Sequence, residues 1–357
     1  MTTHTLLSSS FNKEIYPSSP PINKDEVVIT LLGNDFIADS VIDLGAHKLG
    51  NNVVSYSITA IPYDNITTKT LIKDGFQTLE FDKGMMTKLK PIYELTNSLT
   101  VKTPENEDIP YQKEQKQKTI NFIQDWVKQT YSNIMGINEK DIDVLCSRNL
   151  IMRIAGCDKS SCHIPGNPLF HLDYIDFKKT YDRQCLEQEK YVNPVNCPPF
   201  ENLIDVINIW FPTKPIDDWP LGFINNDNIQ IRDYVPVQIV SGSQAASMRY
   251  KEGLNVCYKK NMKPPEVYMF RSATENVDKK GTFHGSFRIT DKELLRYSVE
   301  IRCCIFKKGV KSPSLQSSKL QSSKLQFSTL ISSGGRTRKI YKYKKKPNRK
   351  TMKYIKQ

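Results

Sequence analysis

The sequence predicts a mainly β protein with flanking helices (α+β), folded as a double-stranded β-helix, or jelly-roll, barrel. Short β-branched runs bounded by Gly, Asn or Pro recur from residue 26 to residue 306, and one prominent stretch has helical spacing. Candidate metal ligands lie far apart along the chain, and no Gly-rich phosphate loop follows a predicted strand. These observations favour an antiparallel barrel over a parallel nucleotide-binding sheet.

The N-terminal half begins with predicted strands. Residues 27–32 and 53–59 are rich in β-branched side chains, and residues 74–81 alternate apolar and polar side chains. Apolar residues at helical spacing then predict a helix over residues 111–131, with its apolar stripe packed on the core. Strand-like spacing returns between residues 142 and 154.

The longest β-branched run, residues 203–212, ends at Pro212 and predicts a buried strand. Period-two alternation places Val206, Asn208 and Trp210 on one face of this strand. Shorter strands are expected after the turn at residues 217–220 and at two further places: residues 235–240 and 266–271.

A last predicted strand, residues 296–303, carries four polar residues on one face: Arg296, Ser298, Glu300 and Arg302. One interpretation is a sheet with one solvated face. The other is that Arg296 and Ser298 line the mouth of a barrel and bind a carboxylate there. In that case Glu300 would orient an arginine from behind the site.

Composition divides the 357 residues into four expected segments. These are a flexible N-terminal arm (1–25), the jelly-roll domain (26–306), a low-complexity Ser/Lys/Leu/Gln linker (307–335) and a basic disordered tail (336–357). The tail holds eleven Lys or Arg residues and no acid, so most of the formal net charge of +13 lies there. The domain itself is nearly neutral.

The basic tail leaves three roles open: nucleic-acid binding, a nuclear or virion-associated address, or solvation of the chain end. No apolar run is long enough to span a membrane, and no apolar signal segment follows Met1. We therefore expect an intracellular, cytoplasmic protein with no membrane contact. Its oligomeric state is not predicted.

The eight cysteines lack the regular spacing of a disulfide framework, which suits a reducing compartment. Cys157, Cys162 and His163 form a close group. They could be half of a zinc site, but no second pair with suitable spacing follows, so thiols in a loop are the favoured interpretation.

The candidate metal ligands are His171, Asp173 and His284. On an extended strand, His171 and Asp173 project from the same face, about 6.5–7 Å apart along the strand. With His284 they would complete a two-histidine, one-carboxylate set, which leaves open positions on non-haem Fe(II). The simpler alternative is a half-exposed strand on which His171 and Asp173 only hydrogen-bond each other.

Taken together, the motifs resemble the CmcJ/AsaB-like hydroxylase/desaturase group of Fe(II)/2-oxoglutarate-dependent oxygenases over residues 70–306. Four blocks carry the resemblance in order: Gly75-Phe76; His171-Leu172-Asp173-Tyr174 with Arg183; Asn208 to Pro212 with Asp218 to Leu221; and His284 to Phe287 with Arg296 to Arg302. Tyr297 stands where the family usually carries Glu, and residues 227–266 match poorly. Those departures put the substrate in doubt more than the metal.

The resemblance implies an enzyme that uses Fe(II), 2-oxoglutarate and dioxygen to hydroxylate or desaturate a small-molecule substrate. Arg296 and Ser298 would bind 2-oxoglutarate, with Arg183 and Arg302 as alternative cations. The substrate pocket would include Tyr174, Asn208 and Trp210. The alternative function is a non-catalytic jelly-roll binding module tethered to nucleic acid by residues 336–357.

Overall fold

A computed structural model describes most of the expected domain as part of one compact unit. The described residues are 26–32, 41–42, 53–63, 69–99, 110–148, 150–156, 168–173, 177–178, 180–182, 185, 197–225, 229–239, 244–274, 281–290, 292 and 294–308. The predicted arm, the basic tail and almost all of the linker lie outside this set, so those predictions stay as they were. No helix within the set is long and apolar enough to cross a membrane.

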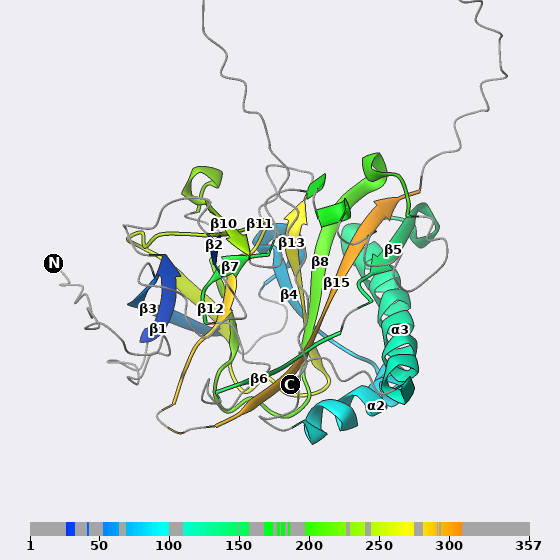
Figure 1. Cartoon of the computed structure of the whole chain (residues 1–357), viewed down its shortest axis with the longest axis horizontal. Coiled ribbons are helices and arrows are strands. Elements are labelled where there is room, and N and C mark those ends of the chain that lie inside the picture. The colour runs from blue at the N-terminus through cyan, green and yellow to red at the C-terminus, as the bar shows by residue number, and fades with distance from the viewer. Residues whose placement is uncertain are drawn as a thin grey trace, which may run out of the picture. The chain divides into compact units, whose positions relative to one another are not determined.

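Two sheets form a jelly-roll barrel, as the sequence predicts (Figure 1). The larger sheet has the order β1 (Glu26–Leu32), β3 (Val53–Tyr63), β12 (Asn255–Lys259), β9 (Leu221–Ile224), β14 (His284–Ser286), β7 (His171–Leu172), β11 (Gln244–Ser247), β10 (Val235–Ile239) and β2 (Val41–Ile42). The smaller sheet has the order β4 (Phe76–Glu80), β13 (Glu266–Thr274), β8 (Leu203–Pro212), β15 (Arg296–Lys307) and β5 (Ile142–Cys146). A further strand, β6 (Ile151–Ala155), also pairs with β15.

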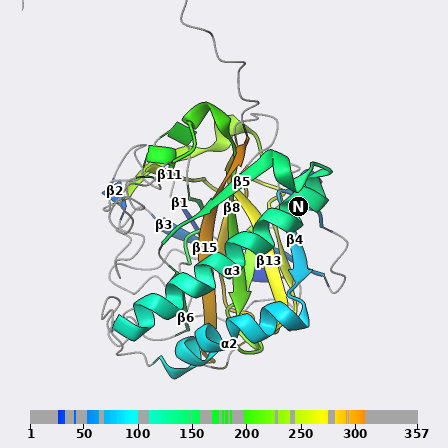
Figure 2. The same ribbon diagram turned by 90° about the vertical axis from the view of Figure 1, so that its right-hand side faces the viewer.

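Two long helices, α2 (Lys83–Ser98) and α3 (Pro110–Met135), cover the outer face of the smaller sheet (Figure 2). The predicted helix at 111–131 is confirmed within α3. The sequence analysis missed α2, whose interior contains Pro91 and whose first turn contains Gly84. Both residue types disfavour helix, but the Asp82 side chain caps the first turn and Leu89 is fully buried against the sheet. Tertiary packing therefore outweighs weak local preference.

Strand β8 shows how alternation divides its side chains between two layers. Ile207, Ile209 and Phe211 pack under the helices in one apolar cluster, whereas Trp210 belongs to a separate aromatic cluster between the sheets. Burial of each such side chain stabilises the fold by roughly 1.5–3 kcal/mol. The predicted assignment of faces on residues 203–212 is confirmed, and the inner face is left for Asn208 and Trp210.

The segment predicted as a strand over 74–81 starts later, at Phe76. Asp74 ends a short helix, α1 (Leu71–Asp74), and Gly75 turns the chain with φ 82°, a conformation that glycine adopts without steric cost. The Gly75 carbonyl accepts hydrogen bonds from the Arg271 backbone N–H (2.8 Å) and the Thr282 hydroxyl (3.0 Å). This turn therefore anchors the chain just before β14.

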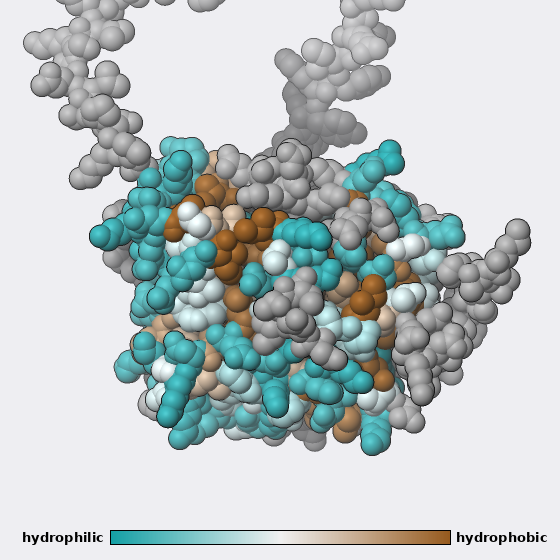
Figure 3. All heavy atoms as spheres, turned by 180° about the vertical axis from the view of Figure 1, so that it is seen from behind, coloured by the Kyte–Doolittle hydropathy of each residue, from teal (hydrophilic) through white to brown (hydrophobic). Residues whose placement is uncertain are grey.

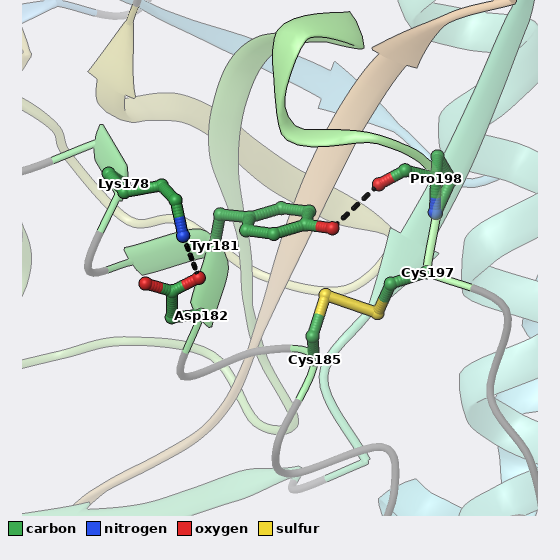
Figure 4. The surroundings of a disulfide bond; sticks show 6 residues. All are labelled: Lys178, Tyr181, Asp182, Cys185, Cys197 and Pro198. Carbon is green, nitrogen blue, oxygen red and sulfur yellow. Dashed lines mark hydrogen bonds and ion pairs between the residues drawn. A yellow bond between two sulfur atoms is a disulfide. The ribbon is translucent and has the colours of Figure 1, made fainter. Parts of the chain in front are cut away.

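Two disulfides contradict the expectation of reduced cysteines. Cys146 on β5 is bonded to Cys303, its direct partner on β15, and Cys185 is bonded to Cys197 (Figure 4). The first pair is 157 residues apart in sequence, so spacing could not reveal it; strand pairing brings the two together. Cys257 is a buried thiol.

Side chains near the second disulfide tie the same region together. The Tyr181 hydroxyl donates to the Pro198 carbonyl at 2.9 Å, and Lys178 pairs with Asp182 one helical turn along the chain (Figure 4). The Tyr181–Pro198 hydrogen bond and the disulfide connect residues within 178–185 to residues 197–198, and the Lys178–Asp182 pair lies within the first of these segments.

The surface seen from behind is mostly hydrophilic, with smaller apolar areas between polar side chains (Figure 3). Among the described residues, four large apolar side chains are exposed: Ile61, Ile72, Ile137 and Leu295. Apolar side chains scattered in this way are normal on a protein surface and indicate no partner.

Candidate metal centre

His171 on β7, Asp173 directly after β7 and His284 on β14 converge between the sheets. His171 on β7 and His284 on β14 are direct partners in the antiparallel ladder, and their ring centroids lie 4.6 Å apart. Asp173 follows β7 by one residue. One ligand atom from each residue lies within 4.8 Å of the others, and all three side chains are buried. This group is the one potential metal site found among the described residues.

Backbone carbonyls orient both imidazoles. His171 Nδ1 lies 2.8 Å from the Leu169 oxygen, and His284 Nδ1 lies 3.1 Å from the Thr282 oxygen. Because a carbonyl oxygen only accepts, each Nδ1 carries a proton, and each Nε2 is the ring nitrogen left to face Asp173. These Nε2 atoms are 3.6 Å and 3.8 Å from the two carboxylate oxygens of Asp173.

Burial keeps the second imidazole neutral. Desolvation, helped by the neighbouring His171, lowers the pKa of His284 from its usual 6.5 to about 4. A neutral imidazole is the form that binds a metal ion. At neutral pH, His284 therefore presents a lone pair rather than a proton.

Asp173 is held ionised by its neighbours. Its burial alone would raise the pKa, but the opposing effects, led by the Arg302 guanidinium, bring the pKa well below its usual range. Arg302 Nη2 donates to one oxygen at 2.8 Å, and Asn208 Nδ2 donates to the other at 2.6 Å. Both carboxylate oxygens are thus fixed in direction.

Glu300 sits beside this pair of donors. Its Oε1 accepts from Asn208 Nδ2 at 3.1 Å and lies 3.2 Å from Arg302 Nη2. Burial raises the pKa of Glu300, and this exceeds the opposing effect of Arg302. Of the two arginines on the predicted polar face, Arg302 is the one that forms an ion pair with Glu300.

Arg296 and Ser298 lie further along the same inner face of β15. Arg296 Nη1 donates to the Trp219 carbonyl at 2.6 Å, and its guanidinium lies 5.2 Å from the Trp210 ring centroid. Trp219 has a positive φ of 57°, which is uncommon for a bulky residue and aims its carbonyl at the arginine. The Ser298 hydroxyl is fully buried and has no hydrogen-bond partner among the described residues.

Two residues near the centre, Ser272 and Arg153, escaped the sequence analysis, and a third, Trp219, entered it only within the block Asp218 to Leu221. Ser272 donates to Asn208 Oδ1 at 2.6 Å, and Trp219 contacts Arg296 as described. Arg153 on β6 faces Ser298 on β15 in the strand register, so both project from the inner face. Each of these contacts joins residues at least 64 positions apart, so no local sequence signal could reveal them.

Several predicted site residues fall outside the described part of the chain. They are Tyr174, Arg183, Cys157, Cys162 and His163. The roles proposed for them, including the zinc alternative, stay predictions.

The fold is that of a class of proteins that includes iron- and 2-oxoglutarate-dependent oxygenases. Among solved structures, it is similar to the "iron and alpha-ketoglutarate-dependent endoperoxidase NvfI", with a TM-score of 0.55 and 14% identity over 79% of this chain and 97% of that one. A second structure, "iron and alpha-ketoglutarate-dependent endoperoxidase NvfI with different conformation", has a TM-score of 0.56 at 14% identity, over 79% and 96% of the two chains. This likeness confirms the predicted jelly-roll fold.

Comparison by sequence is less extensive. A family model described as "YDMC: Oxidoreductase/YMDC permease-like domain" matches residues 187–306, less than half of the chain. None of the curated proteins compared with the sequence matches it. The resemblance to the CmcJ/AsaB-like group therefore stays a prediction.

Proposed function

We propose that this protein is an Fe(II)- and 2-oxoglutarate-dependent oxygenase that hydroxylates or desaturates a small-molecule substrate. The observation that carries the proposal is the convergence of His171, Asp173 and His284 in the interior of a jelly-roll barrel. The simpler alternative, a half-exposed strand with a local His–Asp contact, fits poorly because all three side chains are buried and His284 joins them from another strand.

The donor set fits Fe(II). His171 and His284 would bind the ion through Nε2, and Asp173 would supply a carboxylate oxygen. Two imidazoles and one carboxylate are the ligands that leave positions open on non-haem Fe(II). When bound, iron together with 2-oxoglutarate and dioxygen would supply the oxidising power to cleave a substrate C–H bond. The chain's own part is to hold Asp173 ionised, His284 neutral and both imidazoles aligned.

Arg296 and Ser298 are the proposed anchor for the remote carboxylate of 2-oxoglutarate. A guanidinium and a hydroxyl on one strand face can bind a carboxylate together. Within the described part of the chain the buried Ser298 hydroxyl lacks a partner, which is costly unless a ligand supplies one. Arg302 is a weaker candidate because it already contacts Asp173 and Glu300.

Asn208 and Trp210 are the two described residues that the sequence predicted for the substrate pocket. Asn208 contacts Asp173 directly, so we assign it to the support of the metal centre rather than to the pocket wall. Trp210 lies under the Arg296 guanidinium and would help to orient it. For the alternative of a nucleic-acid-tethered binding module, no contact in the described residues offers support.

The test is a succinate assay. The full chain, purified without oxygen and reconstituted with Fe(II), should convert 2-oxoglutarate to succinate on exposure to air, at least slowly without substrate. His171→Ala should abolish both metal binding and turnover. A parent protein that binds no metal after reconstitution and forms no succinate would contradict the proposal.

A further inference from the structure

Glu300 is a buried carboxylate beside the metal centre that the proposed function leaves without a role. It lies on β15 directly opposite Trp210 of β8 and is 9% exposed. Burying a charge is costly unless hydrogen bonds and an ion pair compensate it. The compensation for Glu300 comes from Asn208 and Arg302, at 3.1 Å and 3.2 Å.

The same two donors hold Asp173. Asn208 Nδ2 donates to Asp173 Oδ2 at 2.6 Å, and Arg302 Nη2 donates to Asp173 Oδ1 at 2.8 Å. Each of the two donors contacts both carboxylates. Glu300 and Asp173 are therefore linked through both donors.

The orientation of the Asn208 amide is determined by a third neighbour. Ser272 donates its hydroxyl hydrogen to Asn208 Oδ1 at 2.6 Å, so the amide nitrogen must face the carboxylates. An amide nitrogen carries two hydrogens, and each has one acceptor here: Asp173 and Glu300. Asn208 is thus satisfied only when both carboxylates are present.

We propose that Glu300 is a positioning residue that holds Asn208 and Arg302 against Asp173 and thereby fixes this carboxylate for metal binding. The inference rests on the proposed function and adds a residue to it. Glu300 also shares the positive charge of Arg302, so that Asp173 is not fully neutralised by its ion pair and stays a strong ligand for a dication.

Glu300→Gln weakens this function while keeping the size of the side chain. Both donors contact Oε1 of Glu300, so a glutamine oxygen in its place could still accept from them, but the negative charge that pairs with Arg302 would be lost. Loss of a residue that supports a metal ligand typically weakens metal binding by about 10- to 100-fold. We expect a loss in that range for Glu300→Gln.

The experiment is calorimetric titration of the metal-free full chain with Mn(II), a divalent probe that avoids oxidation. Glu266→Gln is the matched control, because Glu266 is also a buried glutamate of the smaller sheet and pairs with Lys259 at 3.3 Å, with no recorded contact to Asp173. The thermal midpoint of each metal-free variant is measured beside the titration. A purely structural role would lower that midpoint without changing the affinity of the folded protein.

Support for the inference is a 10- to 100-fold loss of Mn(II) affinity in Glu300→Gln, with parental affinity in Glu266→Gln. Glu300→Asp keeps the charge but withdraws the carboxylate by one methylene, and it should also bind Mn(II) more weakly. Glu300→Asp replaces Glu300→Gln in this experiment if Glu300→Gln does not fold. Parental affinity in either Glu300 variant overturns the positioning role. A parent protein that binds no Mn(II) overturns the proposed function itself, which is a distinct result.

Discussion

Replacing Arg296 with methionine should weaken 2-oxoglutarate binding without removing the metal. The guanidinium is buried, with 3% of the residue exposed, and lies between the Trp219 carbonyl and the Trp210 ring. Methionine keeps an unbranched apolar stem in that space and removes the charge. The contact with a carboxylate at this position would be lost.

The size of the effect follows from charge-assisted hydrogen bonds. Each is worth about 1.5–3 kcal/mol in a buried site, and a carboxylate would lose one or two of them. The middle of that range, a loss of roughly 2–4 kcal/mol, corresponds to about 30- to 1,000-fold weaker binding, at 1.4 kcal/mol for each factor of ten. The hydroxyl of Ser298 would retain part of the affinity.

The assay is titration of the Mn(II)-loaded protein with 2-oxoglutarate, supported by the KM for 2-oxoglutarate in the succinate assay. Arg302→Met is the matched control, since both arginines lie on one face of β15 but only Arg302 contacts Asp173. We expect Arg302→Met to weaken Mn(II) binding and Arg296→Met to leave it unchanged. If Arg296→Met bound 2-oxoglutarate as tightly as the parent, the assignment of the anchor would be wrong.

Four other predictions concern the metal, acid stability, packing and a disulfide. His171→Ala should bind no Mn(II) in calorimetry, and retained binding would refute its role as a ligand. The pKa of His284 is lowered on folding, so its contribution to the stability of the metal-free protein is complete above about pH 6.5 and falls by roughly 3 kcal/mol as the pH falls toward 4; urea unfolding should show a pH dependence of this sign, and His284→Gln should reduce it. Ile123→Ala in α3 should cost about 2–5 kcal/mol, measured by the same method, because the side chain is fully buried under the sheet. Cys185→Ser should cost about 2–4 kcal/mol under oxidising conditions and nothing after reduction; equal stability in both states would mean that the bond with Cys197 does not form.

Local pattern was a reliable guide where burial alternates along a strand. The alternation in residues 203–212 correctly separated Ile207, Ile209 and Phe211 from Asn208 and Trp210, because one face of β8 packs on helices and the other faces the barrel interior. It failed at α2, whose Gly84 and Pro91 weaken the local signal for helix.

The candidate site was predictable only in its chemistry. His171 and Asp173 are two residues apart, and strand periodicity alone places them on one side. His284 could be named as their partner only because histidines are few in this chain. By contrast, Ser272 and Arg153 carry no local feature that separates them from ordinary strand residues. Their contacts follow from strand pairing.

The amino-acid order by itself determined the fold class, most strand positions and the identity of the three candidate metal ligands, because these depend on periodicity and on residue chemistry. Tertiary structure decided which groups surround them. It joined Arg302, Asn208 and Glu300 around Asp173, and it paired Cys146 with Cys303. These contacts depend on the register between strands that are distant in sequence, and register is set by the packing of the whole barrel.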